Sequence, residues 1–321
     1  MRLNPQPNRR KADSEPWGLS RRGALTCMVW AGTGILWTLS GGVPKSFGLL
    51  RDALAAEASA FTFLQISDSH IGFNKPANPD ALGTLREAIG KVKALKSRPA
   101  FMIHTGDITH LSKPDEFDNA DKIIGEVKLD VHYVPGEHDV IDEGLGKAYL
   151  ARYGKGTKGE GWYSFDDYGV HFIGLVNVVD LKAGGLGRLG ADQLTWLVDD
   201  LKDKSSSTPI VIFAHIPLWT VYADWGWGTD DGLQALNLLR RFGSVTVLNG
   251  HIHQIVQKVE GNMTFHTARS TCFPQPAPGT APGPGPLTVP AEQLRSELGI
   301  ASVEVRTGDK PLAITDTPLA G

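Results

Sequence analysis

The fold of this chain is indicated first by residues 61–70, FTFLQISDSH. Aromatic, β-branched and aliphatic residues dominate the first part of the segment, a composition typical of a buried strand. The segment then ends in Asp68, Ser69 and His70. A strand that ends directly in an acidic residue and a histidine places two potential metal-binding side chains at the edge of a sheet.

Downstream of this strand, strand-like runs alternate with segments of helical periodicity. Single strands are expected at 99–104, 131–134, 209–214 and 245–248. Antiparallel pairs are expected at 161–165 with 170–178 and at 255–258 with 263–267. Helical spacing is found at 80–95, 115–127, 192–201 and 230–242. This alternation predicts an α/β layered fold, and the antiparallel pairs favour a mixed sheet or two-sheet sandwich over a purely parallel sheet.

The composition is that of a soluble globular protein, with 41% apolar and 21% charged residues among 321. The net charge of −3 gives no indication of a nucleic-acid-binding surface. After an N-terminal segment at 1–58 we expect one domain, 59–321, which contains a proline- and glycine-rich loop or linker at 273–290. The tail at 300–314 is expected to return one or two edge strands.

The N-terminal segment has the layout of a bacterial export signal. Arg21 and Arg22 precede a weakly apolar stretch, and small residues follow between Ala53 and Ala60, where cleavage is expected. The paired arginines predict passage through the twin-arginine translocase and a periplasmic or extracytoplasmic location. A membrane anchor is the alternative, although several glycines and Pro44 interrupt the stretch and no other segment could span a bilayer.

The chain has few cysteines, Cys27 inside the expected signal and Cys272 in the domain. Cleavage would leave one thiol and no internal disulfide, which suits a protein with a large core.

Polar residues gather where five of the expected strands end. Any single cluster could be an ordinary hydrogen-bonded loop, but in open α/β sheets ligands bind beyond the carboxyl ends of the strands. Together the clusters offer imidazoles and carboxylates, a donor set suited to Zn, Fe or Mn, and they predict a dinuclear metal site. The clusters are Asp68-Ser69-His70, Gly106-Asp107-Ile108-Thr109-His110, Gly136-Glu137-His138-Asp139, His215-Ile216-Pro217 and Asn249-Gly250-His251-Ile252-His253.

The order of these motifs, D-x-H, G-D-x-x-H, G-E-H-D, H-x-P and G-H-x-H, resembles that of the calcineurin-like metallophosphoesterases. Within that family the chain is most similar to bacterial phosphodiesterases related to the class III cyclic-nucleotide phosphodiesterases. The resemblance covers roughly residues 61–270. It implies a four-layer α/β/β/α sandwich with two mixed β-sheets.

The resemblance also implies two divalent or mixed-valence metal ions and hydrolysis of a small-molecule phosphoester by a metal-bridging hydroxide that attacks phosphorus in line. The implied first-metal ligands are Asp68, His70 and His253, the bridging ligand is Asp107, and the second-metal ligands are Glu137, His215 and His251. His138 would face the substrate, and Asp139 would assist catalysis by orienting an imidazole.

Glu137 departs from the family pattern, which has an asparagine at this position. The additional negative charge should weaken attraction to a phosphate dianion, so a phosphodiesterase is favoured over a monoesterase. Two alternatives stay open on the same fold. One is non-hydrolytic or redox metal chemistry, with Glu137 and Cys272 as adaptations, and the other is a metal-poor binding module.

Four further residues are candidates for substrate binding: His110, Trp219, Arg269 and Cys272. Trp219 belongs to an aromatic run at 218–227, and Arg269 and Cys272 follow the last motif. The remaining histidines of the domain lie inside strand-like runs and are expected to be structural: His104, His132, His171 and His266. The oligomeric state has no signature in the sequence.

Overall fold

The computed structural model describes residues 35–40, 43–48, 61–142, 144, 146–179, 181–182, 184–305 and 312–321. The chain divides into two compact units, Met1–Ala58 and Ser59–Gly321. In the first unit, β1 (Ile35–Ser40) pairs antiparallel with β2 (Val43–Gly48). The arginine pair of the predicted export signal and the predicted cleavage region lie outside the described residues. Among the described residues, no helix has the length and apolar character needed to cross a membrane.

One sheet of the second unit has five strands and is mixed. The three strands from the first part of the domain pair parallel with one another. The first of the two C-terminal strands pairs antiparallel with one of these three, and the second pairs antiparallel with the first. In spatial order the strands are β13 (Ala313–Pro318), β12 (Gly299–Val305), β3 (Phe61–Ile66), β4 (Phe101–His104) and β5 (Asp130–Tyr133). The tail therefore does return two strands, but only β13 is at the edge, since β12 pairs on both sides.

The other sheet has six strands and is also mixed. Four parallel strands form its centre, and an antiparallel strand closes each edge. In spatial order the strands are β10 (Gln257–Glu260), β11 (Met263–Thr267), β9 (Val245–Asn249), β8 (Ile210–Phe213), β7 (Val170–Gly174) and β6 (Tyr163–Asp167). The predicted hairpin at 255–267 is confirmed, with Glu260 paired to Met263 across the turn.

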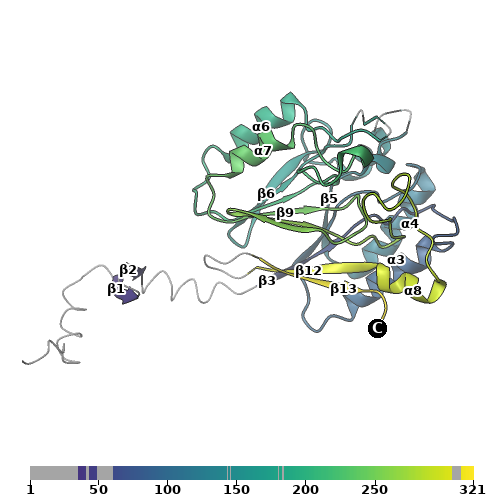
Figure 1. Cartoon of the computed structure of the whole chain (residues 1–321), viewed down its shortest axis with the longest axis horizontal. Coiled ribbons are helices and arrows are strands. Elements are labelled where there is room, and N and C mark those ends of the chain that lie inside the picture. The colour runs from purple at the N-terminus through teal and green to yellow at the C-terminus, as the bar shows by residue number, and fades with distance from the viewer. Residues whose placement is uncertain are drawn as a thin grey trace, which may run out of the picture. The chain divides into compact units, whose positions relative to one another are not determined.

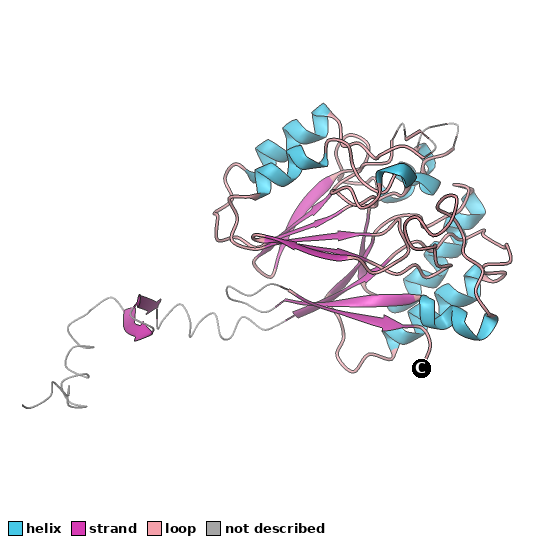
Figure 2. Cartoon of the chain, viewed as in Figure 1, coloured by secondary structure: helices cyan, strands magenta, loops and turns pink. Residues whose placement is uncertain are grey.

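Helices cover the outer face of each sheet (Figures 1 and 2). On the five-stranded sheet these are α3 (Ala81–Lys93), α4 (Pro114–Ile124), α5 (Lys147–Tyr153) and α8 (Ala291–Glu297), and on the six-stranded sheet α6 (Ala191–Leu201) and α7 (Gly232–Leu239). Short 3-10 turns occur at Gly125–Val127, Glu137–Asp139 and Ala223–Trp225. The four predicted helices are confirmed; three are shorter than predicted, and α6 begins one residue earlier than predicted. The sequence missed α5 and α8 because seven residues are too few for a helical period to stand out.

The two sheets pack face to face through aromatic side chains. Phe63 of β3 stacks on Phe101 of β4 at 5.1 Å, and Phe172 of β7 meets both rings edge-on at 5.5 and 5.2 Å. Burial of each such side chain contributes about 1.5–3 kcal/mol. With separate apolar clusters between each sheet and its helices, the predicted four-layer sandwich is confirmed.

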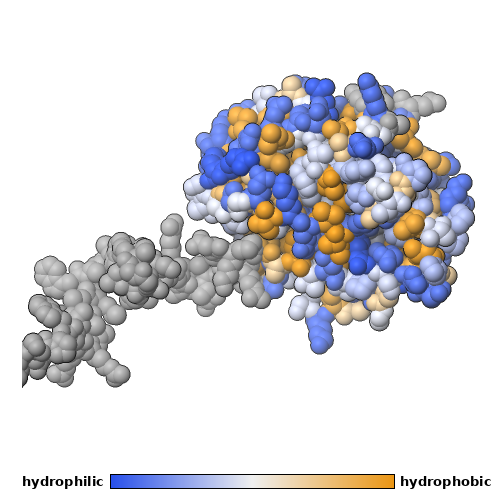
Figure 3. All heavy atoms as spheres, in the orientation of Figure 1, coloured by the Kyte–Doolittle hydropathy of each residue, from blue (hydrophilic) through white to orange (hydrophobic). Residues whose placement is uncertain are grey.

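The face of the molecule shown in Figure 3 is neither uniformly hydrophobic nor uniformly hydrophilic. On the face shown in Figure 3, hydrophobic residues are interspersed with hydrophilic ones. This is the ordinary surface of a folded domain, because polar residues alone cannot cover it.

Candidate metal centre

The five polar motifs follow β3, β4, β5, β8 and β9, and the backbone of these loops is unusually tight. Several non-glycine residues adopt left-handed backbone angles, which are rare for residues with a Cβ and persist only where the surroundings enforce them. Outside the motifs only Ser112, Lys128 and Tyr168 do so among the described residues. Within them, the residues and their φ angles are Asp68 (54°), His70 (40°), Asp107 (55°), His251 (69°) and His253 (53°). The strained residues are thus the predicted ligands.

Glycines let the loops approach one another at the centre. A Cβ on Gly136 would lie 2.1 Å from Asp107 Oδ1. A Cβ on Gly250 would lie 2.0 Å from Ser67 Oγ and 2.6 Å from Asp68 Oδ2. Since real Cβ atoms do not make such contacts, the glycines of G-E-H-D and G-H-I-H are required for the loops to meet.

The first group of donor atoms consists of Asp68, His70 and His253, which come from β3 and from the turn after β9. His253 Nε2 lies 3.1 Å from Asp68 Oδ1 and 3.2 Å from His70 Nε2. All three side chains are buried. This is the predicted ligand set of the first metal.

The second group consists of Glu137, His215 and His251. Glu137 Oε2 lies 2.9 Å from His215 Nε2, and Glu137 Oε1 lies 3.0 Å from His251 Nδ1. Glu137 Oε2, His215 Nε2 and His251 Nδ1 are all buried without a hydrogen bond. Buried polar atoms without partners are costly, so three of them directed at one point fit a shared cation.

Asp107 lies between the two groups. Its Oδ2 atom is 3.5 Å from His70 Nε2 in the first group and 3.4 Å from His215 Nε2 in the second. Its Oδ1 atom accepts a hydrogen bond from the backbone N–H of His138 at 2.9 Å. The structure therefore places Asp107 where the sequence predicts a bridging ligand.

Backbone carbonyls orient two of the imidazoles. His215 Nδ1 donates to Thr105 O, and His253 Nδ1 donates to Phe273 O, each at 2.6 Å. Donation through Nδ1 leaves the lone pair of Nε2 facing the donor groups, as metal-binding histidines require. The mixed nitrogen and oxygen set fits Zn, Fe or Mn.

The charges of the centre are coupled. Burial opposes the ionised form of Glu137, but His251 and His215 hold its pKa well below the ordinary value. Burial likewise opposes protonation of His138, but Asp107 and Glu137 raise its pKa. Glu137 is thus held in its ionised form, and His138 beside it favours the protonated form.

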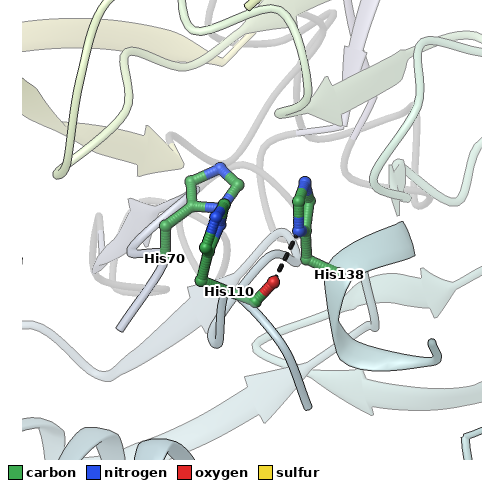
Figure 4. A group of neighbouring side chains, drawn as sticks. All are labelled: His70, His110 and His138. Carbon is green, nitrogen blue, oxygen red and sulfur yellow. Dashed lines mark hydrogen bonds between the residues drawn. The ribbon is translucent and has the colours of Figure 1, made fainter. Parts of the chain in front are cut away.

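His138, His110 and His70 form a cluster at the mouth of the centre (Figure 4). The rings of His110 and His138 stack with centroids 4.7 Å apart. His138 Nδ1 donates to the backbone oxygen of His110 at 2.7 Å. Its Nε2 atom is then available to a substrate, and His138 and His110 both line the adjoining cavity.

Asp139 has a different role from the predicted one. Its carboxylate is fully buried and accepts from Ile108 N at 3.1 Å, Thr109 N at 2.8 Å, Thr109 Oγ1 at 2.9 Å and Gly136 N at 3.0 Å. The prediction that Asp139 orients an imidazole is wrong, since all four bonds go to the two loops. Asp139 fastens the G-D-x-x-H loop to the G-E-H-D loop and does not reach the cavity.

A cavity of about 660 Å³ opens over the donor groups. Of the four tentative substrate residues only His110 lines it. Trp219 packs on Phe265 at 4.8 Å in the core, and Arg269 donates to the backbone oxygen of Ser296. Cys272 is buried in an apolar cluster with Phe73 and Phe273, where burial raises its pKa well above the ordinary value. None of Trp219, Arg269 and Cys272 lines the cavity, so the structure lends no support to the substrate roles predicted for them.

The sequence missed the residues that form the far wall of this cavity. Trp225 and Trp227 come from the same aromatic run as Trp219, and Pro284 and Pro286 come from the proline- and glycine-rich segment. The aromatic run at 218–227 indicated that aromatic residues could line the cavity, but the sequence does not show which of its rings do so.

Four histidines predicted to be structural lie outside the donor groups. His171 contacts Asp166 and Asp200, each at 2.8 Å, and His266 contacts Asp316 at 3.0 Å. His104 lies 2.9 Å from Ser69 Oγ, and His132 stacks on Phe165 at 3.9 Å.

Comparisons with known proteins agree with this geometry. The profile of the calcineurin-like phosphoesterase family matches residues 61–255. The glycerophosphodiester phosphodiesterase GpdQ of Enterobacter lignolyticus is 24% identical over 59% of this chain and 69% of its own length. A probable cyclic nucleotide phosphodiesterase of Synechococcus is 27% identical over 69% of this chain and 86% of its own length.

Solved structures share the fold. A dimetal phosphatase from Danio rerio superposes with a TM-score of 0.54 at 14% identity, covering 80% of this chain and 98% of its own. A purple acid phosphatase from yellow lupin superposes with a TM-score of 0.58 at 13% identity, covering 82% of this chain and 52% of its own.

Proposed function

The chain belongs to the calcineurin-like phosphoesterase family and is a metal-dependent phosphoester hydrolase, and from that premise we propose that it is an exported dinuclear phosphodiesterase. The observation that carries the proposal is the convergence of two three-residue donor groups on either side of Asp107. When bound there, two metal ions would act as Lewis acids and make a water molecule nucleophilic near neutral pH.

The chain's own residues supply positioning and a proton. The Nδ1 atom of His138 is committed to the backbone oxygen of His110, so Nε2 is the free donor of the ring. With its pKa raised by Asp107 and Glu137, against the opposing effect of burial, His138 can donate that proton to the leaving oxygen of an ester. Asp139 keeps His138 and Asp107 in register, because it joins the loops that carry them.

A diester fits the charge of the cavity better than a monoester does. Glu137 adds a negative charge that the asparagine of the family pattern would not have, and it disfavours a dianion. Among the described residues that line the cavity, Lys182 is the only lysine or arginine. Two relatives named as phosphodiesterases, of glycerophosphodiesters and of cyclic nucleotides, support the same class.

Export is the second part of the proposal. It rests on the paired arginines Arg21 and Arg22, the weakly apolar stretch after them and the small residues before 61. Fractionation of the native host with and without an Arg21→Lys, Arg22→Lys double change tests it. Loss of the periplasmic protein in the double variant is expected, and an unchanged distribution contradicts export by the twin-arginine route.

The hydrolytic activity is tested with metal-replete full-length protein and a matched substrate pair. Bis(4-nitrophenyl) phosphate should be hydrolysed faster than 4-nitrophenyl phosphate. The change His138→Ala should lower kcat on the diester by about 10²–10⁴-fold, the usual contribution of a positioned acid, while metal content measured by mass spectrometry stays near two ions. Metal-replete protein that hydrolyses neither substrate would refute the proposal.

The redox alternative has lost one of its two grounds. It used Glu137 and Cys272 as adaptations, and Cys272 is buried in an apolar cluster and does not itself line the cavity. A metal-poor binding module is disfavoured by the three unpartnered donor atoms of the second group.

A further inference from the structure

The lining of the cavity over the metal centre is of two kinds. Polar lining comes from the histidines and carboxylates of the metal centre. The apolar lining includes Val140, Ile141, Val178, Leu181, Trp225 and Trp227. We name these six residues the apolar annex.

The tryptophan wall of the annex is rigid. Val221 N and Trp227 N donate to the backbone oxygens of Trp227 and Tyr222 at 2.7 and 3.0 Å, which closes the loop on itself. The Trp225 and Trp227 rings meet edge-to-face at 5.1 Å. Both pack against Ile252, which lies between the donor residues His251 and His253. The wall is therefore fixed relative to the metal centre, as a specificity surface must be.

The proline- and glycine-rich segment also lines the cavity, through Pro284, Gly285 and Pro286. This segment is fastened to the same turn. Gln275 Nε2 donates to His251 O at 2.9 Å, and Gln254 Nε2 donates to Gln275 O and Pro276 O at 3.1 and 2.7 Å. Leu287 N donates to Pro274 O at 2.8 Å, which returns the segment over the cavity. The segment, predicted as an extended loop or linker, is a loop that lines the cavity.

The size and charge of the cavity restrict what can fill it. A volume of about 660 Å³ is in the range of pockets that bury a whole organic ligand, and it exceeds the needs of a phosphoryl group alone. Beyond the donor groups, Asp107 and the histidines, the exposed Lys182 is the only charged residue among the described lining residues. Outside the metal centre, only Lys182 and Gln275 among the described lining residues offer a charged or amide side chain to a sugar or a second phosphate, whereas an apolar group would release water from the six apolar residues.

We propose that the apolar annex binds a bulky apolar ester group of the substrate, so that the preferred substrates are phosphodiesters with at least one aromatic or similarly large apolar substituent. This inference rests on the proposed phosphodiesterase function. It adds the substrate class, which is set by the tryptophan loop and the proline- and glycine-rich segment.

Two phosphinates test the annex without any bond that the enzyme could hydrolyse. Methyl(phenyl)phosphinate and dimethylphosphinate are both monoanions and differ only in one phenyl group. Calorimetric titration into metal-loaded full-length protein should show the phenyl compound binding about 10- to 100-fold more tightly, as burial of one aromatic ring predicts.

Three variants test whether residues of the apolar annex cause the preference for the phenyl compound. Ile141→Ser changes a lining residue that is 54% exposed and should lower the phenyl preference by about threefold without affecting folding. Trp225→Leu removes the ring wall and should lower the preference by about tenfold. Val259→Ser is the matched control, because Val259 is 72% exposed and does not line the cavity. It should leave both affinities and the activity unchanged.

The outcomes separate this inference from the function on which it rests. A phenyl preference below about twofold in the unmodified protein, or an unchanged preference in both annex variants, overturns the annex. Failure of both phosphinates to bind overturns it as well. Turnover of methyl 4-nitrophenyl phosphate is measured in parallel. Turnover without a phenyl preference supports the phosphodiesterase function and refutes the role of the annex. A phenyl preference without turnover supports the role of the annex and refutes the phosphodiesterase function.

Discussion

The change Asp139→Asn tests whether a buried carboxylate holds the metal centre together. Asp139 accepts four hydrogen bonds, from the backbone N–H groups of Ile108, Thr109 and Gly136 and from the hydroxyl of Thr109. Asparagine keeps the size of the side chain but replaces one acceptor oxygen with an NH₂ donor. The substitution is therefore nearly isosteric and changes only hydrogen bonding and charge.

The cost follows from the geometry of these bonds. In the better of the two amide orientations, the NH₂ group faces Thr109, whose hydroxyl can turn to accept while its backbone N–H loses its partner. One buried N–H without an acceptor costs about 1–3 kcal/mol. The two bonds that remain on the oxygen lose their charge-assisted character, at about 1 kcal/mol together. Burial and Asp107 raise the pKa of Asp139 to about 6, so the loss of the buried charge offsets part of this cost. The net cost of about 2 kcal/mol corresponds to a fall in Tm of roughly 4–8 °C for a domain of this size.

Calorimetric unfolding at pH 7.5 measures this directly, alongside metal content and diester turnover. Asp199→Asn is the matched control, because the Asp199 side chain is 68% exposed and pairs with Lys202 on the surface. Thr109→Val removes one of the four bonds and should lower Tm by only about 2–4 °C. If Asp139→Asn unfolds within about 1 °C of the control, the role assigned to Asp139 is refuted.

Three further changes address the ligand set, the loop packing and the pH dependence. Glu137→Asn removes a unit charge from the second donor group, so metal content should fall from about two ions towards one, and the diester-to-monoester rate ratio should fall by several-fold to about tenfold; unchanged metals and rates would contradict our account of Glu137. Gly136→Ala would place a Cβ 2.1 Å from Asp107 Oδ1 and should lower metal content and Tm, whereas Gly90→Ala in helix α3, where a Cβ meets nothing within 4 Å, should raise stability by about 0.5–1 kcal/mol; equal effects would refute the steric argument. Burial lowers the pKa of His104 to about 3. Between about pH 6.5 and pH 3, His104 therefore binds a proton in the unfolded chain but not in the folded chain. The free energy of unfolding is then complete above pH 6.5 and falls as the pH drops from about 6.5 towards 3, and His104→Gln should reduce the loss between pH 7 and pH 5 by about 2 kcal/mol in denaturant titrations. Parallel curves for the two proteins would show that His104 does not contribute.

The sequence alone was sufficient to predict the fold class and the candidate metal-binding residues, because both follow from short-range patterns. In a parallel sheet the carboxyl ends of neighbouring strands meet at one edge, so residues that follow strands such as 61–66 and 101–104 are brought together whatever the rest of the chain does. Period and composition locate such strands, and the motifs then locate Asp68 and Asp107. The same signals are too weak for a seven-residue helix such as α5.

The direction of each side chain in a loop was decided by contacts between distant residues. Trp219 and Trp225 belong to one aromatic run, yet one packs on Phe265 and the other faces the cavity. Arg269 and Cys272 follow the last motif closely, but their side chains turn to Ser296 and to an apolar cluster. Periodicity gives no information of this kind, because loop side chains follow no fixed alternation.

What the sequence by itself determined is thus the order of the strands along the chain and the metal-binding residue types that follow them, since both depend on short-range pattern. What only the tertiary structure decided is which residues surround that chemistry. Asp139 joins two loops through bonds across about thirty residues, and the segment at 273–290 becomes a cavity wall through the side chains of Gln254 and Gln275. These contacts form only when the sheets have brought the loops together, so no local pattern could encode them.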